Sequence, residues 1–143
     1  MKNYIKILAI AISIFLIGNT LIFAEINFTK HEITPYFQAG TDLELIDIDG
    51  DNDLDVVASS YDEEVSWFEN DGSQNFTGHD VSVGFIGTRF VVAKDKNGNP
   101  LDMDNDGDVD IVAAGMEIDK VSWFENDGNE NFTERLICDN FSA

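Results

Sequence analysis

The sequence predicts an all-β fold in which two units of four short antiparallel strands follow one another. One observation is a repeated segment, Val-Ser-Trp-Phe-Glu-Asn-Asp-Gly, which occurs at 65–72 and again at 121–128. A second is Asn-Phe-Thr, which begins at Asn27, Asn75 and Asn131 and marks repeats of 48 and 56 residues. Third, no stretch after the amino-terminal segment shows helical periodicity over a useful length. Together these features indicate a β-repeat architecture.

The strands can be placed in order within each unit. In the first unit, the strand-like segment 43–46 precedes an acidic loop and the segment 56–59 follows it. The side chains at 64–69 alternate as in a mostly buried strand, and an Asn-Asp-Gly turn connects this strand to the segment 75–81. The second unit repeats this order in the segments 90–93, 111–114, 121–125 and 132–137. Four short antiparallel strands in a unit of about 45 residues are typical of one blade of a β-propeller.

An acidic stretch at 47–55 recurs at 102–110, each time with aspartates at alternate positions. Like charges about 4 Å apart cost roughly 1 kcal/mol even in water, so such a loop needs solvent or a cation between its carboxylates. Oxygen ligands at this spacing are typical of a hard cation such as calcium. We therefore predict about two Ca²⁺ ions, one in each loop. The candidate ligands are Asp47, Asp49, Asp51, Asp53, Asp55, Asp102, Asp104, Asp106, Asp108 and Asp110.

These loops do not match the EF-hand, which needs a bidentate Glu at position 12 and flanking helices. Position 12 is Ala58 in the first loop and Ala113 in the second, and apolar strand-like segments flank both. The closing ligand is instead predicted at position 9. At position 7 we expect the backbone carbonyl to bind the ion while the aspartate side chain points outward.

Position 6 of the loops is Asn52 in one and Gly107 in the other. Glycine adopts the left-handed conformation more easily than asparagine. We therefore expect the second loop to form more readily. An insert of seven residues, 95–101, precedes the second loop. Its residues Asp95, Asn97 and Asn99 resemble half a metal loop, but an extended surface loop with Gly98 and Pro100 is the favoured interpretation.

Residues 1–24 are predicted to be a signal peptide. Lys2 and Lys6 precede an apolar run at 7–17, and Ala24 is the expected cleavage point. A permanent membrane anchor is the less favoured alternative, because polar residues interrupt the apolar run. We thus expect a secreted protein, extracellular or at the cell surface, with a periplasmic location as a further option. The single Cys138 cannot form an internal disulfide, which leaves calcium as the available staple.

The net charge excludes several partner classes. The full chain carries a charge of −20, and loss of the two leader lysines makes it −22. A surface this acidic argues against binding nucleic acid or anionic membranes. It also favours neutralisation by cations. Interleaved Val, Ile, Leu, Trp and Phe argue against a disordered acidic tract.

The acidic loop, followed by the Val-Ser-Trp-Phe-Glu-Asn-Asp-Gly segment, resembles the FG-GAP-like or VCBS repeats of secreted bacterial proteins. These are similar to the calcium-binding blades of integrin α-chain propellers. The resemblance covers roughly 26–137, within a repeat region at 25–143. It implies that the strand before each calcium loop is the innermost and that Asn-Phe-Thr lies on the outermost. The blades are then about 43–81 and 90–137, with 26–33 as the outer strand of a preceding blade.

A complete propeller has roughly 4–8 blades, so the predicted fold class is an incomplete propeller with about two blades. Open blade edges invite pairing. We favour a truncated or fragmentary gene product over self-assembly as a homo-oligomer. Partner blades from another chain are a further alternative.

No candidate catalytic constellation is found, and the chain is predicted not to be an enzyme. The paired carboxylates all belong to the predicted metal loops, and no Gly-x-Ser-x-Gly occurs. His31 and His79 share one repeat position with Arg135, which favours polar outer-strand sites. Trp67 and Trp123 are expected in the core between blades, with sugar-stacking platforms as the alternative.

The predicted function is that of a secreted calcium-binding β-propeller repeat module in binding or adhesion, with structural calcium and an unknown protein or carbohydrate ligand. The alternative is an accessory non-catalytic segment of an exported polysaccharide-active enzyme, or a lectin-like carbohydrate-binding module.

Overall fold

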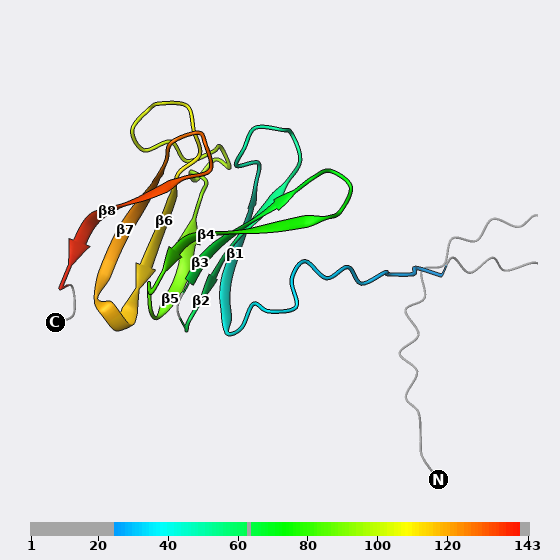
Figure 1. The fold of residues 1–143 in the computed structure, drawn as a ribbon, viewed down its shortest axis with the longest axis horizontal. Coiled ribbons are helices and arrows are strands. Elements are labelled where there is room, and N and C mark those ends of the chain that lie inside the picture. Colours follow the sequence, from blue (N-terminus) through cyan, green and yellow to red (C-terminus); the bar gives the residue numbers. More distant parts are fainter. Residues whose placement is uncertain (1–24, 63, 141–143) are drawn as a thin grey trace, which may run out of the picture. The chain divides into compact units, whose positions relative to one another are not determined.

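The all-β prediction is confirmed. A computed structural model describes residues 25–62 and 64–140 (Figure 1). All strands belong to the compact unit that begins at His31. The elements are β1 (Gly40–Ile46), β2 (Asp55–Ser60), β3 (Glu64–Asn70), β4 (Phe76–Val83), β5 (Thr88–Val92), β6 (Ile111–Gly115), a 3-10 turn η1 (Met116–Ile118), β7 (Lys120–Asn126) and β8 (Phe132–Asp139).

The strands form two antiparallel sheets of four, in the orders β1-β2-β3-β4 and β5-β6-β7-β8. Each sheet is thus a meander in which consecutive strands are neighbours, as expected for blade-like units. The two sheets pair their first two strands in the same register. Leu43 faces Ala58 in the first sheet, and Val91 faces Ala113 in the second. Figure 1 shows that the β1–β2 and β5–β6 loops project from the same end of the sheets.

Each sheet has two faces because side chains alternate along a strand. We call face A the side that carries Val56, Ala58 and Phe68 in the first sheet and Ile111, Ala113 and Phe124 in the second. Face B is the opposite side, with Val57, Val65 and Trp67 in the first sheet and Val112, Val121 and Trp123 in the second.

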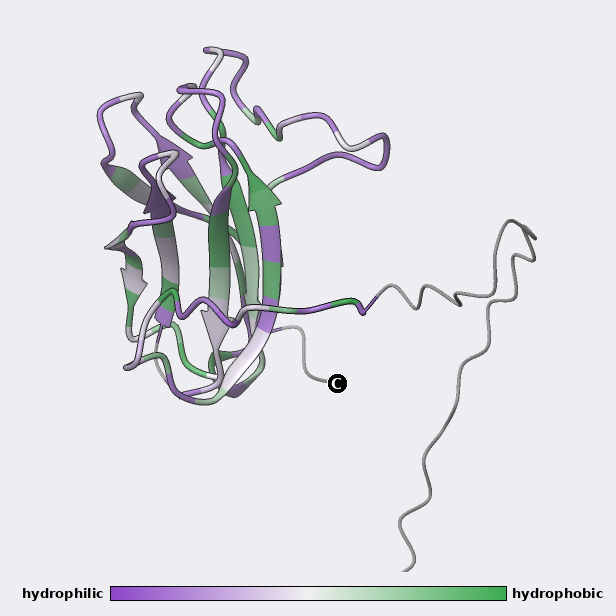
Figure 2. Cartoon of the chain, turned by 90° about the vertical axis from the view of Figure 1, so that its right-hand side faces the viewer, coloured by the Kyte–Doolittle hydropathy of each residue, from purple (hydrophilic) through white to green (hydrophobic). Residues whose placement is uncertain are grey.

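The main core lies between face B of the first sheet and face A of the second. Val57, Val65 and Trp67 are fully buried and share one cluster with Ile111 and Phe124. Fully burying a side chain of this size contributes roughly 1.5–3 kcal/mol, so this joint is the main source of apolar stabilisation. In Figure 2 the hydrophobic colour lies mainly along the strands, in alternation with hydrophilic bands, and the loops at the upper end are mostly hydrophilic.

A phenylalanine from the segment before each sheet packs on face A. The ring of Phe37 meets that of Phe68 edge-on at 5.6 Å, and Phe85 meets Phe124 in the same way at 5.4 Å. Phe37 and Phe85 are 48 residues apart, which is the repeat length. The repeat therefore includes the segment that leads into each sheet.

Side chains of β1 cover the free edge of β5. Asp42 accepts a hydrogen bond from the backbone N–H of Val91 at 3.2 Å, and Glu44 accepts one from Ala93 at 3.3 Å. Since an open strand edge exposes unpaired backbone groups, these two carboxylates satisfy backbone donors along the edge of β5.

The predicted outer strand at 26–33 does not form. These residues have no regular secondary structure, and no strand pairs with them among the described residues. A strand needs a neighbour for its backbone hydrogen bonds. The predicted signal peptide, 1–24, lies outside the described residues. Within the described part of the chain, no helix has the length and apolar character needed to cross a bilayer.

Candidate metal centres

Each acidic loop connects the first two strands of its sheet and gathers three carboxylates. In the first loop these belong to Asp47, Asp49 and Asp55. In the second they belong to Asp102, Asp104 and Asp106. In either group, the chosen oxygen atoms lie within 4.8 Å of one another. The structure therefore brings together the predicted ligands at positions 1 and 3 of both loops.

The third member differs between the loops. It is position 9, Asp55, in the first and position 5, Asp106, in the second. Asp51 and Asp110 were predicted as ligands but are not part of these groups. The donor set fits calcium, because ligand oxygens about 2.3–2.6 Å from one ion lie at most about 5 Å from each other.

The aspartate at position 1 organises its loop. Asp47 accepts hydrogen bonds from the backbone N–H groups of Gly50 at 2.8 Å and Asn52 at 3.0 Å. Asp102 likewise accepts from the amides of Asn105, at 2.6 Å, and Gly107, at 3.1 Å. Each loop thus curls around its first carboxylate, which places that group at the centre of the acidic cluster.

The aspartate at position 9 joins the loop to the third strand. Asp55 is fully buried and accepts hydrogen bonds from the amides of Ile48, at 3.0 Å, and Asn70, at 2.9 Å. Asp110 is equally buried and accepts from Met103 at 2.6 Å and from the amide of Asn126 at 3.0 Å. A buried carboxylate is tolerable here because backbone donors satisfy it.

Both loops use one glycine and one asparagine in the left-handed region. In the first loop these are Gly50 (φ 81°) and Asn52 (φ 75°). In the second the order is reversed, with Asn105 (φ 69°) and Gly107 (φ 103°). Since the conformational cost at asparagine arises once in each loop, the structure removes the basis for expecting the second loop to form more readily.

The side chain at position 7 does not point outward as predicted. Asp53 and Asp108 are partly buried, and their carboxylates lie over the glycines of the β3–β4 and β7–β8 turns. A Cβ added at Gly72 would lie 2.2 Å from Oδ2 of Asp53, and one added at Gly128 would lie 2.5 Å from Oδ2 of Asp108. The positive φ of both glycines and the carboxylate of the acidic loop beside each therefore favour glycine at this position of the repeated Asn-Asp-Gly segment.

The asparagine of the same segment was not among the predicted site residues. Nδ2 of Asn70 donates to the Leu54 carbonyl at 3.1 Å, and Nδ2 of Asn126 donates to that of Val109 at 3.2 Å. Their Oδ1 atoms accept from the amides of Gly72 and Gly128. Each asparagine therefore ties its loop to the next turn. The sequence feature that could have identified this asparagine is its identical repetition after each acidic loop.

The carboxylates at position 3 are held at an electrostatic cost. The pKa of Asp49 is raised, first by partial burial and then by the negative charges of Asp51, Asp55 and Asp47. The pKa of Asp104 is raised too, by desolvation and then by the charge of Asp106. A cation at either cluster would relieve this repulsion.

A polar cavity of about 410 Å³ lies beside the first loop. Asp49 of that loop lines it together with Asp108 of the second loop, Glu130 and Trp67. Carboxylates from both sheets thus line one space, which concentrates negative charge at this end of the molecule.

The insert before the second loop forms a hairpin turn around Asp95. Asp95 accepts hydrogen bonds from the amides of Asn97 at 2.7 Å and Asn99 at 2.9 Å, and Lys94 bridges Pro100. Asp71 and Asp127 form the same turn after β3 and β7. These contacts, led by the bond from the Asn99 amide, lower the pKa of Asp95 to about 2.

The histidine and arginine at the shared repeat position each contact a glutamate of the neighbouring strand. Nε2 of His79 lies 2.8 Å from a carboxylate oxygen of Glu69, and its ring stacks on Trp67 with 4.4 Å between centroids. Arg135 pairs with Glu125 in the second sheet. Both contacts join the third and fourth strands of a sheet, in keeping with the predicted polar outer-strand role.

The chain was compared with protein-family models, with curated proteins and with solved structures, and none of the three comparisons finds a match.

Proposed function

We propose that this chain is a secreted, calcium-stabilised repeat module of the β-propeller type that serves binding or adhesion. The observation that carries the calcium part is the paired geometry of the loops. Two separate loops each place three carboxylates with oxygens within 4.8 Å of one another, at the distances that calcium ligands require. The export and the binding role rest on the predicted leader and on the resemblance to FG-GAP-like and VCBS repeats.

In this proposal the role of calcium is structural. An ion in the first loop would be held by Asp47, Asp49 and Asp55, and Asp55 in turn holds the end of β3 through the Asn70 amide. The ion would therefore link three strands of the sheet. It would also neutralise the neighbouring negative charges that, after desolvation, raise the pKa of Asp49. Binding energy of this kind adds to the folding free energy. At a free calcium concentration ten times the dissociation constant, each site adds roughly 1.4 kcal/mol.

The lectin alternative loses one of its two candidate platforms. Trp67 is fully buried between His79 and Phe132, so its ring cannot stack on a sugar. Trp123 is only partly buried.

The test is calcium binding to the full chain by equilibrium dialysis and titration calorimetry. We expect two ions per chain. Changing Asp47 and Asp49 together to asparagine should leave one, and the matched change at Asp102 and Asp104 should also leave one. Asp95→Asn is the control, because Asp95 lies in a turn outside both clusters, and this variant should keep both ions.

Absence of bound calcium at millimolar concentration would overturn the calcium proposal. Export is tested separately, by the position of the amino terminus and the cell fraction in which the expressed protein is found. A mature protein that begins near Glu25 outside the cytoplasm is expected. An uncleaved protein in the cytoplasm would contradict export without affecting the calcium result.

A further inference from the structure

The joint between the two sheets has two halves, and each half occurs once more on the molecule without a partner. Face A of the second sheet is covered by the first sheet. In the first sheet the β2 and β3 side chains of face A are buried with Phe37, but the β1 side chains of that face are exposed. Val91 and Ala93 of the second sheet are 2% and 0% exposed, whereas the equivalent Leu43 and Leu45 of the first are 60% and 45% exposed. The residues are equivalent because Leu43 faces Ala58 and Val91 faces Ala113 in the same register.

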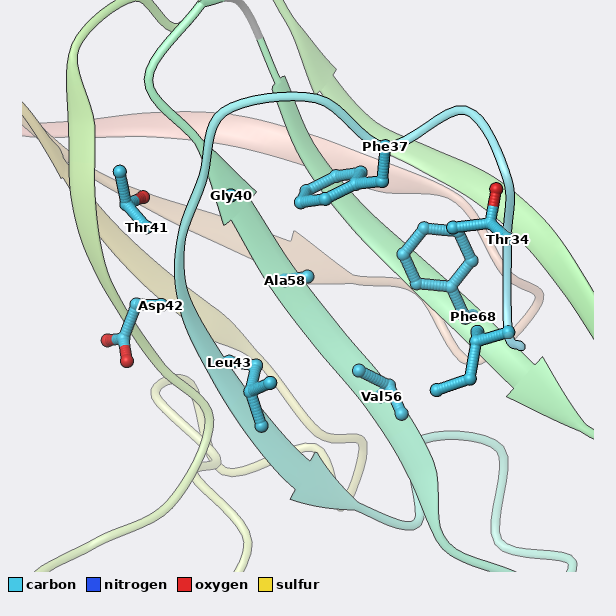
Figure 3. Close-up of a pocket in the computed structure, with 10 residues that line it drawn as sticks. Thr34, Phe37, Gly40, Thr41, Asp42, Leu43, Val56, Ala58 and Phe68 are labelled. Carbon is cyan, nitrogen blue, oxygen red and sulfur yellow. The ribbon is translucent and has the colours of Figure 1, made fainter. Parts of the chain in front are cut away.

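The open face A is already shaped like the covered one. Phe37 packs edge-on against Phe68 just as Phe85 packs against Phe124. Figure 3 shows Phe37, Phe68, Val56, Ala58 and Leu43 around a hollow, which has a volume of about 460 Å³. This surface therefore has the same aromatic pair and the same β2 positions that receive a sheet elsewhere in the chain.

The open face B belongs to the second sheet. Phe90 is 65% exposed and Val92 is 41% exposed. Their equivalents in the first sheet are Asp42 and Glu44, the two carboxylates that cover the edge of β5. Trp123, the counterpart of the fully buried Trp67, is only partly buried.

The two open halves differ from the closed joint in a matched way. In the closed joint, Asp42 and Glu44 of face B lie against Val91 and Ala93 of face A. At the equivalent positions, the open face B carries Phe90 and Val92. The open face A carries Leu43 and Leu45. The open face A and the open face B are thus both more apolar than their counterparts in the closed joint. The changed positions are ones that would meet if the same joint formed between two molecules. Exposed apolar side chains clustered on a sheet face mark an interaction surface.

We propose that a second copy of this chain docks there, with face B of its second sheet on face A of the first sheet of its neighbour. Phe90 and Val92 of one copy then lie against Leu43 and Leu45 of the next. The contact is head-to-tail, so an open assembly of any length keeps one unpaired face A and one unpaired face B until a ring closes. This inference goes beyond the calcium proposal and rests only on the sheet faces.

The test is the mass of the full chain in calcium, by size-exclusion chromatography with light scattering, over a wide range of protein concentration. The wild-type mass should rise above that of one chain. Leu43→Lys and Phe90→Lys should each weaken association roughly tenfold to a hundredfold, because a lysine would be desolvated in an apolar contact. Val83→Lys is the matched control, since Val83 is an exposed residue (71%) of the outer strand β4, and its equivalent in the second sheet, Asp139, stays exposed beside the closed joint. This variant should associate like the wild type.

Mixing the two variants gives the sharpest result. Leu43→Lys retains its face B and Phe90→Lys retains its face A, so an equimolar mixture should form a species of two chains that does not grow further. Circular dichroism and calcium stoichiometry show whether each variant is folded, and Val92→Lys replaces Phe90→Lys if the latter is not. A wild type that stays a single chain, a mixture that does not pair, or association unchanged by both variants would each overturn the proposal. Calcium binding is measured on the same samples, and its result tests the calcium proposal independently of whether the chain associates.

Discussion

The two sheets contain the same six residues, Val-Ser-Trp-Phe-Glu-Asn, in their third strands, yet these residues lie in different surroundings. In β3, Val65 and Trp67 are fully buried because the second sheet covers them. In β7, Val121 and Trp123 are only partly buried. The comparison shows that the strand sequence sets which face a side chain occupies, while its burial depends on what packs against that face.

Replacing the two tryptophans separately would test this difference most strongly. Trp67→Ala should cost about 3–5 kcal/mol of unfolding free energy, the range for a large aromatic residue removed from a core. Trp123→Ala should cost clearly less, because the side chain of Trp123 is only partly buried in a single chain. The comparison is made at protein concentrations that keep the chain monomeric. Denaturant unfolding in calcium measures both. Equal losses in a monomer would show that something within the chain covers Trp123 as well.

The two acidic loops differ in sequence but share a backbone conformation. Gly50 and Asn52 in one loop, and Asn105 and Gly107 in the other, occupy the same two left-handed positions in opposite order. Position 6 considered alone suggested that the two loops differ in stability. The two left-handed positions considered together do not suggest a difference. Equivalent loops thus need not match at every position, provided that the required conformations are all supplied.

Substituting the turn glycines should sharpen the comparison, because here the two sheets are expected to agree. Gly72→Ala and Gly128→Ala each place a Cβ in the left-handed region, at about 1–2 kcal/mol, and against an aspartate of the neighbouring loop. Gly84→Ala is the control, since Gly84 also has positive φ (83°) but nothing within 4 Å of its added Cβ.

Thermal or denaturant unfolding should therefore rank Gly72→Ala and Gly128→Ala as similar and both as costlier than Gly84→Ala. Adding Asp53→Ala to Gly72→Ala should recover the excess. If Gly72→Ala and Gly84→Ala cost the same, the contact between Asp53 and the turn has no energetic weight, and only the backbone conformation matters.

The sequence predicted the features that depend on local pattern. Strand alternation and the repeated turn segment placed all eight strands, and the spacing of the aspartates identified both loops, because these signals are carried by neighbouring residues. It did not predict that Asp42 and Glu44 cover the edge of β5, or that Asp53 lies over Gly72. Those contacts join residues about 20 to 50 positions apart, and no local pattern encodes which surfaces meet. The missing strand at 26–33 shows the same limit, since a strand-like pattern forms no strand without a neighbour.

The smallest predicted effect concerns the insert at 95–101, which has no equivalent in the sequence of the first unit. Asp95 has a folded-state pKa of about 2, below its ordinary value of 3.8, chiefly because the Asn99 amide donates to its carboxylate. A lowered pKa means that the stabilisation is complete above the ordinary value and is lost as the pH falls through about 2. Because this carboxylate is solvent-exposed, its protonation should open the 95–99 turn without unfolding either sheet. NMR titration of the Asp95 carboxyl group and of the Asn99 amide should show both changes together below pH 3.8, and Asp95→Ala should abolish them. A carboxyl group that titrates at 3.8, with an Asn99 amide that does not respond, would mean that the turn is held by its backbone alone.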